Sequence, residues 1–402
     1  MNPPSILHER NYLTYLCGSV FSTQGIWIQR MTLGWMIWDL THSETWLGLL
    51  AFLMFFPVVL VGPLFGVLVD RINRRRAAVL ISLMLSAFGF CLAVLVAGGL
   101  IGAPGVLLFA LGIGITNSAY QAVRLSLVPE LVSAPNMSRA VAINAILFNS
   151  ARFIGPMIAG LLINLQGSAL SFAVTGACYL PLTGVLLCLR LDEHRRRDGK
   201  APGAFLVDLA AGVRYARRES LIARLLLVIC CAAIFGRGLL EILPAVADGL
   251  YGRGVEALAA LTSAAGFGSI IAGLLLSASG TERLPLALRL AGIGSGALLI
   301  LFSLGGRFES GLLIVTALSF CATVCGVATQ SLIQISLDSA YRGRVMSLWG
   351  ALNVGGGAIG GLLFGLLTEF AGFGPSLLLP GLAMMATSAY ATRNLHAFRR
   401  VG

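Results

Sequence analysis

The charged side chains that fall deep inside long apolar stretches of the sequence include Arg30, Arg152, Arg237 and Glu241. A charge in such a place is costly, so it normally faces a partner, a water-filled cavity or a ligand. Arg237 and Glu241 are four residues apart, so on a helix they share a face and can pair. Glu241 is therefore either half of a structural ion pair or a carboxylate that takes up and releases a proton.

The composition indicates that these apolar stretches cross a membrane. Of the 402 residues, 57% are hydrophobic and only 11% are charged, whereas soluble domains are about half apolar. Continuous apolar runs of about 20 residues predict membrane helices rather than barrel strands. Twelve such runs are expected, at 12–38, 45–69, 77–99, 103–127, 139–165, 168–190, 221–247, 256–279, 285–305, 310–335, 343–369 and 375–393. The first run is too long for a secretory signal, so we expect it to be retained as a helix.

The basic residues are distributed unevenly between the connections. With the N-terminus inside, the odd-numbered connections carry only Arg253 and Arg307, and the remaining loop and tail arginines fall on the opposite side. By the positive-inside rule both termini are expected in the cytoplasm, and we interpret Arg75 and Arg76 as cytoplasmic charges of this kind. The rule accounts for the net charge of +11 without a nucleic-acid partner, and the basic segments are expected to face anionic lipids.

Two halves of the sequence repeat on either side of a polar connection. The segment 191–220 begins with "DEHRRRDGKAPG" and continues as a predicted amphipathic helix on the inner surface. It separates residues 1–190 from residues 221–402. At an offset of 205, Arg139, Gly155, Gly160 and Gly167 correspond to Arg344, Gly360, Gly365 and Gly372, and at 207, Arg30 and Gly66 correspond to Arg237 and Gly273. The predicted fold is an all-α membrane protein of twelve helices in two pseudo-symmetric halves. The same offset predicts that Arg30 and Arg237 lie at equivalent depth.

The segment "GVLVDRINRRR" at 66–76 resembles the loop signature G-x-x-x-D-R-x-x-R-R between helices 2 and 3 of the major facilitator superfamily. The segments "GIWIQRMTLGWMIWDLTHS" and "LVPELVSAPNMSRAVAINAI" are similar to the branch that contains enterobactin exporters and macrolide-efflux pumps. The resemblance covers nearly the whole chain and implies the major facilitator fold.

This resemblance implies a gating role for the loop. In the superfamily the loop latches the two halves together on the cytoplasmic side. By this resemblance, Asp70 is expected to contact the start of the eleventh predicted helix near Arg344, and Arg74 is expected to pair with an acid such as Glu130. In the second half, Ser277 stands where Asp70 stands in the first. The expected gating residues are Gly66, Asp70, Arg71, Arg74, Glu130 and Arg344.

A second motif lies in the fifth run. "ARFIGPMIAG" is similar to the antiporter signature G-x-x-x-G-P-x-x-G-G, with alanine at 151 and 159 in place of two glycines. The resemblance suggests export driven by inward proton flow. Its residues here are Arg152, Gly155, Pro156 and Gly160. We expect Arg152 to pack between helices, against a carbonyl or an acid.

In this superfamily helices 1, 4, 7 and 10 line the central cleft. On these helices the resemblance selects Gln24, Trp27, Arg30, Asn117, Tyr120, Gln121, Arg124, Arg237, Glu241, Gln330 and Gln334 as candidates for substrate binding or coupling. Polar residues at helical spacing also hold membrane helices together, so both roles stay open. Arg30 has a further alternative, which is to extend toward the outer membrane surface. A mostly apolar cavity with aromatic residues suits a bulky amphipathic ligand.

The predicted function is secondary active export of an amphipathic small molecule, such as a siderophore, a drug or a related metabolite, by proton antiport with alternating access. We expect a monomer in a bacterial inner membrane. The alternatives are a lipid or lysolipid transporter, and a non-transporting sensor or scaffold on the same fold. Walker loops, G-x-S-x-G and H-E-x-x-H are absent from the sequence, so neither an enzyme nor an ATP-driven pump is supported. No cofactor, metal or nucleic acid is expected.

Overall fold

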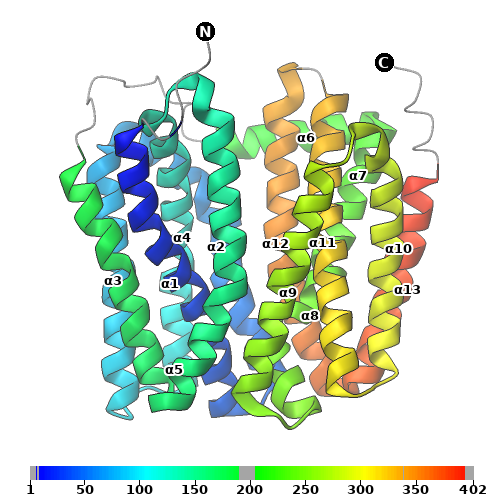
Figure 1. Ribbon diagram of the computed structural model, residues 1–402. Coiled ribbons are helices and arrows are strands. Elements are labelled where there is room, and N and C mark those ends of the chain that lie inside the picture. The colour runs from blue at the N-terminus through cyan, green and yellow to red at the C-terminus, as the bar shows by residue number, and fades with distance from the viewer. Residues whose placement is uncertain (1–5, 7–8, 190–203, 338, 394–402) are drawn as a thin grey trace. The chain divides into compact units, whose positions relative to one another are not determined.

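The computed structural model describes residues 6, 9–189, 204–337 and 339–393, and Figure 1 shows them as a set of long helices. Within these ranges the chain contains helices and no strand. The residues form two compact units. The first unit comprises Met1–Leu40 and Pro57–Pro202, and the second comprises Thr41–Phe56 and Gly203–Gly402.

Five long helices precede the segment 190–203. They are α1 (Arg10–Thr41), α2 (Glu44–Arg71), α3 (Arg74–Ala97), α4 (Ala103–Leu131) and α5 (Met137–Cys188), with the short η2 (Ala134–Asn136) before α5. Helix α5 is interrupted by non-helical backbone at Gln166 and Gly167. Its two arms run in opposite directions from this break (Figure 1), and they cover the fifth and sixth predicted runs.

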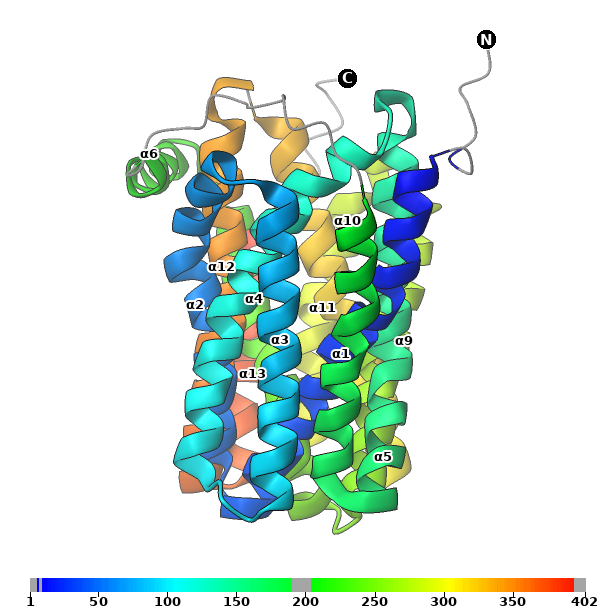
Figure 2. The same cartoon turned by 90° about the vertical axis from the view of Figure 1, so that its left-hand side faces the viewer.

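The second unit contains the remaining helices. They are α6 (Ala204–Arg218), α7 (Ser220–Cys231), η3 (Ala232–Gly236), α8 (Arg237–Glu241), η4 (Ala245–Leu250), α9 (Gly254–Ser277), η5 (Thr281–Arg283), α10 (Leu284–Ser303), α11 (Phe308–Ser336), α12 (Ser339–Ala371) and α13 (Phe373–Thr392). Helix α6 lies across the end of α12, as Figure 2 shows. The ring of Tyr215 on α6 stacks on that of Tyr341 at 4.5 Å between centroids. Helix α6 is the amphipathic helix that the sequence predicts in the second part of the segment 191–220. The first part of that segment, 191–203, lies outside the described residues.

Nine helices of the described residues are long and apolar enough to cross a membrane. One of the nine includes both arms of α5, and each of the twelve predicted runs falls on helical segments of the structure, the run 221–247 on several short ones. The all-α, multi-pass fold is therefore confirmed, while the number of twelve crossings stays a prediction.

The internal repeat is visible in the backbone. Gly167 separates the arms of α5 with φ 76° and ψ −176°, and Gly372 separates α12 from α13 with φ 75° and ψ 170°. This conformation is open to glycine and strained for any residue with a Cβ. The two glycines are 205 residues apart, as the sequence repeat predicts.

Helix contacts repeat in the same way. A Cβ at Gly89 of α3 would lie 2.6 Å from the backbone nitrogen of Gly176 in the second arm of α5. In the second unit, Gly296 of α10 meets Gly381 of α13 equally closely. These pairs are related by the offsets 207 and 205. Glycine at such crossings lets membrane helices pack backbone to backbone, so both units use the same packing device.

Small residues also fix α1 against the second arm of α5. Gly18, Gly25 and Thr32 are spaced seven residues apart along one face of α1, and neither glycine has room for a Cβ against that arm. The hydroxyl of Thr32 lies 2.6 Å from that of Ser171. This contact sets the position of α1, which carries three of the predicted site residues.

The first part of α2 belongs to the second unit. There Gly48 packs against the backbone of Gly361, and Gly365 packs against the carbonyl of Glu44. At the start of α2, one carboxylate oxygen of Glu369 accepts hydrogen bonds from the Ser43 hydroxyl at 2.5 Å and the Thr45 amide at 2.8 Å. Glu369 on α12 therefore caps the N-terminus of α2, where a negative charge is favourable.

Candidate functional site

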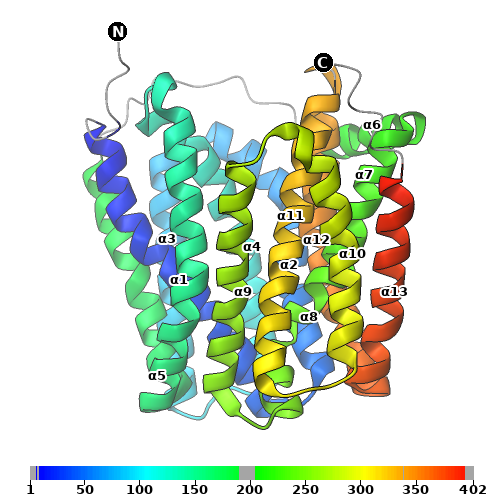
Figure 3. The ribbon, with the colours of Figure 1, turned by 45° about the vertical axis from the view of Figure 1, so that its right-hand side comes forward.

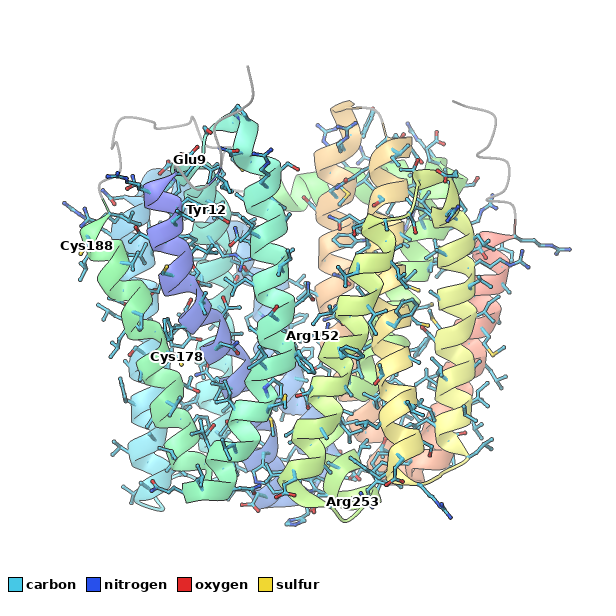
Figure 4. All side chains as sticks on the ribbon, viewed as in Figure 1. Glu9, Tyr12, Arg152, Cys178, Cys188 and Arg253 are labelled. Carbon is cyan, nitrogen blue, oxygen red and sulfur yellow. The ribbon has the colours of Figure 1, made fainter. Side chains whose placement is uncertain are left out.

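Two arginines flank one tryptophan in the first unit. The guanidinium carbon of Arg30 lies 5.1 Å from the centre of the Trp27 ring, and that of Arg152 lies 5.5 Å from it; Figure 4 labels Arg152. The ring of Phe148 meets Trp27 edge to face at 5.5 Å. Gly155 permits this arrangement, because a Cβ there would lie 2.6 Å from the Cβ of Trp27. The glycine of the helix 5 signature thus brings α5 close enough for Arg152 to lie over Trp27.

The remaining residues near this cluster are packed inside the unit. Pro156 and Gly160 are buried within α5. Trp27 is only 6% exposed, and its Nε1 is buried without a hydrogen-bond partner, as is Oε1 of Gln24. Gln24, Trp27 and Arg30 follow one another at three-residue spacing on α1. The structure therefore brings Gln24, Trp27, Arg30 and Arg152 together, a grouping that the sequence did not predict.

The polar residues of α4 differ in burial. Asn117 and Arg124 are half-buried and Gln121 is exposed. Tyr120 is buried, and its hydroxyl lies 3.5 Å from that of Ser22 on α1. Tyr120 therefore contributes to the contact between α1 and α4, which is the helix-packing role left open by the sequence.

In the second unit, Arg237 and Glu241 are the first and last residues of the five-residue helix α8. Both are half-buried. Nη1 of Arg237 donates a hydrogen bond to Oδ1 of Asn353 on α12 at 3.4 Å. The stem of Glu241 packs against Gly361, where an added Cβ would lie 3.1 Å from the Cβ of Glu241. Both side chains therefore face α12.

The backbone around α8 departs from the single continuous helix predicted over 221–247. The π-helical segments η3 and η4 lie before and after it, with Pro244 between α8 and η4. A π-helical turn widens the helix and shifts its side chains, and such turns are frequent at functional sites. Sequence periodicity did not reveal these segments, because they keep the apolar composition of the surrounding helix.

On α11, Gln330 is half-buried and Gln334 is exposed. Their neighbour Thr329 is buried, and its hydroxyl accepts a hydrogen bond from Nε1 of Trp349 at 3.2 Å. The same hydroxyl donates to the carbonyl of Cys325 at 2.6 Å. Part of the polar face of α11 is therefore engaged in packing against α12.

Arg74 of the loop 66–76 forms the ion pair expected from the resemblance. Arg74 and Glu130 form a salt bridge, with side chains 14% and 21% exposed. A Cβ at Gly66 would meet nothing within 4 Å, so the structure gives no steric reason for that glycine. The side chains of Asp70 and Arg71 lie outside the described residues.

Arg75 of the first unit and Arg344 of the second each make further contacts. Nε of Arg75 donates to the carbonyl of Leu186 at 2.7 Å, and Nη2 donates to that of Leu187. Arg75 thus caps the C-terminal end of α5, where a cation is favourable. From the sequence, Arg75 is interpreted only as a cytoplasmic charge, and this cap is not predicted. Arg344 is exposed on α12, with its guanidinium 5.8 Å from the ring of Tyr341.

Glu9 provides a further contact that the sequence did not predict. Its Oε1 accepts hydrogen bonds from the amide of Ser133 at 3.1 Å and from the Ser133 hydroxyl at 2.5 Å, and Asn136 donates to it at 3.3 Å. The Ser133 hydroxyl and amide hold the pKa of Glu9 below its usual range. The start of α1 is thereby fastened to the connection between α4 and α5.

Comparison with known proteins identifies the family. The profile of a major facilitator family described as "Transmembrane secretion effector" matches residues 5–398. The chain belongs to this family. It is therefore a multi-pass membrane transporter with a small-molecule substrate, not an enzyme. Within the described ranges, no group of three or more His, Cys, Asp or Glu residues could hold a metal ion.

Curated relatives include siderophore transporters. The chain is 27% identical over 342 residues to an enterobactin exporter from Shigella boydii, which covers 81% of this chain and 77% of the exporter. It is 26% identical over 171 residues to the staphyloferrin A transporter of Staphylococcus aureus. That match covers 42% of each protein. The similarity to the enterobactin exporter branch is thus confirmed.

The solved structures with the same fold are those of transporters. The peptide transporter POT superposes with a TM-score of 0.78 at 15% identity, covering 97% of this chain and 96% of that one. A bacterial homologue of the lysosomal transporter Spinster, in an inward-facing and unoccupied conformation, gives 0.74 at 15% identity with the same coverage. These likenesses establish the major facilitator fold.

Proposed function

We propose that this secondary transporter exports an amphipathic small molecule of the siderophore class in exchange for protons, by alternating access. The observation that carries the substrate class is the similarity to an enterobactin exporter over 81% of the chain. We place the protein in a bacterial inner membrane, with both termini in the cytoplasm because of the uneven distribution of basic residues, and we propose that it acts as a monomer.

Glu241 is the proposed carrier of the coupling proton. It is a half-buried carboxylate within an apolar helix, and it lies between two π-helical segments. Intramembrane carboxylates of this kind are the usual groups of proton relays. The alternative is a structural role for Glu241 beside Arg237, in which only stability depends on the charge.

Glu241→Gln separates these roles, because it mimics the protonated carboxyl permanently. With enterobactin as the probe, uptake driven by a pH gradient into inverted vesicles should fall at least tenfold, while exchange without a gradient continues. Glu256→Gln, at an exposed carboxylate at the start of α9, is the control. Undiminished gradient-driven uptake, together with a lowered melting temperature, would assign Glu241 to structure instead. Absence of enterobactin transport by the wild type would contradict the proposed substrate class.

We further propose that the loop 66–76 controls the rate of conformational exchange, with Asp70 as its central carboxylate. Asp70→Asn preserves volume and removes charge, so one conformational state loses stabilisation. Turnover should fall about tenfold, which corresponds to about 1.4 kcal/mol, while the melting temperature and membrane insertion stay unchanged. Wild-type turnover in reconstituted vesicles would rule out this role, and Glu282→Gln, at an exposed carboxylate, serves as the control.

A further inference from the structure

A groove opens on the surface of the first unit, where the start of α3 meets the end of α5. It has a volume of about 440 Å³, and Figure 2 shows α3 beside the second arm of α5. Its lining combines polar and aliphatic side chains, among them Asn73, Arg75, Arg76, Leu80, Leu83 and Leu187. No described carboxylate lines it. The groove therefore joins positive charge to an apolar wall.

The charged and apolar parts of the groove lie at different depths along α3. Arg76, Leu80 and Leu83 share one face of the helix, because they are spaced by four and three residues. At 1.5 Å per residue, Leu83 lies about 10 Å further along the helix than Arg76. Leu80, Leu83 and Leu187 are 60%, 44% and 57% exposed. In a membrane these leucines meet acyl chains, while the arginines at the helix start reach the headgroup layer.

The two arginines of the groove keep hydrogen-bonding capacity. The cap of α5 uses Nε and Nη2 of Arg75, and Nη1 has no acceptor among the described residues. Arg76 is exposed, and its backbone amide donates to Oδ1 of Asn73 at 3.0 Å. The preceding Arg74 pairs with Glu130 and does not line the groove. Guanidinium groups bind phosphate through paired, charge-assisted hydrogen bonds, so Arg75 and Arg76 suit a phosphate ligand.

The second unit shows that the fold does not require this pair of arginines. The repeat offset of 207 places Thr281, Glu282 and Arg283 at the positions 74–76. Glu282 thus replaces Arg75, and its Oε1 lies 3.9 Å from Nε of Arg283. The equivalent helices α10 and α13 nevertheless lie side by side (Figure 3). The same helix pair therefore forms with opposite charges at this position, and the double positive charge of the first unit calls for a reason other than packing.

We infer that this groove binds a phospholipid with an anionic headgroup. The phosphate meets Arg75 and Arg76, and an acyl chain covers Leu80 and Leu83. A basic pocket at the end of membrane helices favours anionic headgroups, whereas a zwitterionic lipid brings its own cation toward the arginines. A free phosphate ion would leave the apolar wall uncovered. This site goes beyond the proposed export function and does not depend on it.

Native mass spectrometry of the full-length protein, released from detergent, tests the site. The probes are dioleoyl phosphatidylglycerol and dioleoyl phosphatidylcholine, which have the same acyl chains and differ in headgroup charge. The wild type should bind its first phosphatidylglycerol at least tenfold more tightly than phosphatidylcholine. Arg75→Gln and Arg76→Gln should each weaken phosphatidylglycerol binding at least fivefold and leave phosphatidylcholine unchanged. Arg283→Gln removes the same charge at the equivalent position, where the side chain is 75% exposed, and should bind like the wild type.

Equal affinity of the wild type for the two lipids would overturn the inference, as would wild-type phosphatidylglycerol affinity in Arg76→Gln. Arg76 is exposed and caps no helix, so this variant decides the question even where Arg75→Gln loses the cap of α5 and fails to fold. Glycerol 1-phosphate, which is a headgroup without acyl chains, should not displace the lipid at a hundredfold excess. Displacement would assign the groove to a soluble phosphate compound and reject the lipid.

Discussion

At the scale of single residues, the first unit is held together by contacts between side chains and segments that are far apart in the sequence. Glu9 reaches Ser133, and Arg75 reaches the end of α5 at Leu186. Sequence analysis could predict the Arg74–Glu130 pair because a family motif relates the two positions. No motif or periodicity relates Glu9 to Ser133, so that contact required the structure.

Glu9→Gln should destabilise the protein in a pH-dependent way. The Ser133 hydrogen bonds lower the pKa of Glu9 in the folded state, so its charge contributes stability above the ordinary pKa of about 4. That contribution is lost as the pH falls through the lowered value. The variant should lose about 1 kcal/mol at pH 7, and the gap to the wild type should close as the pH falls below the lowered pKa of Glu9. Thermal melts of the variant and the wild type over a series of pH values below 7 measure this difference in stability, and the exposed Glu282→Gln is the control. A gap independent of pH would show that the charge of Glu9 is not involved.

At the scale of elements, continuous apolar runs predicted the long helices, nine of which among the described residues could cross a membrane, and matched glycines predicted the repeat that Gly167 and Gly372 display. What periodicity missed was local helix geometry. The change from α to π around α8 leaves the composition unchanged, and the approach of Arg152 to Trp27 depends on how closely Gly155 lets two helices pack. Sequence analysis selected these residues singly, but their grouping depends on three-dimensional packing.

Gly167→Ala should be far more harmful than Gly184→Ala, although both lie in α5. Gly167 has φ 76° and ψ −176°, a conformation that costs an alanine about 1–3 kcal/mol. Gly184 lies within the second arm, and a Cβ there would meet nothing within 4 Å, so alanine should be neutral or stabilise by about 0.5–1 kcal/mol. Thermal unfolding of the two purified variants makes the comparison. Equal melting temperatures would contradict a requirement for glycine at the break.

At the scale of the whole molecule, the loop signature correctly predicted the transporter family, and the repeat predicted two related halves. The packing units do not coincide with these sequence halves, however. Residues 41–56 come from the first half and pack in the second unit. The glycines Gly48, Gly361 and Gly365 at this contact were visible in the sequence, but nothing in their spacing indicated that they meet.

Because residues 41–56 pack in the second unit, the gene cannot be divided into two independent halves at the polar connection. A fragment that starts after the polar connection, at residue 204, lacks 41–56, so it leaves bare the face of α12 that carries Gly361 and Gly365 and strands the carboxylate of Glu369 without Ser43 and Thr45. We expect this fragment to be degraded when expressed alone, and to accumulate when a fragment ending at residue 203 is expressed with it. Pulse-chase labelling in cells measures both half-lives. Equal persistence of the lone fragment would show that the second unit needs no part of α2. A working two-piece transporter should therefore arise by complementation between fragments, and not from two self-sufficient halves.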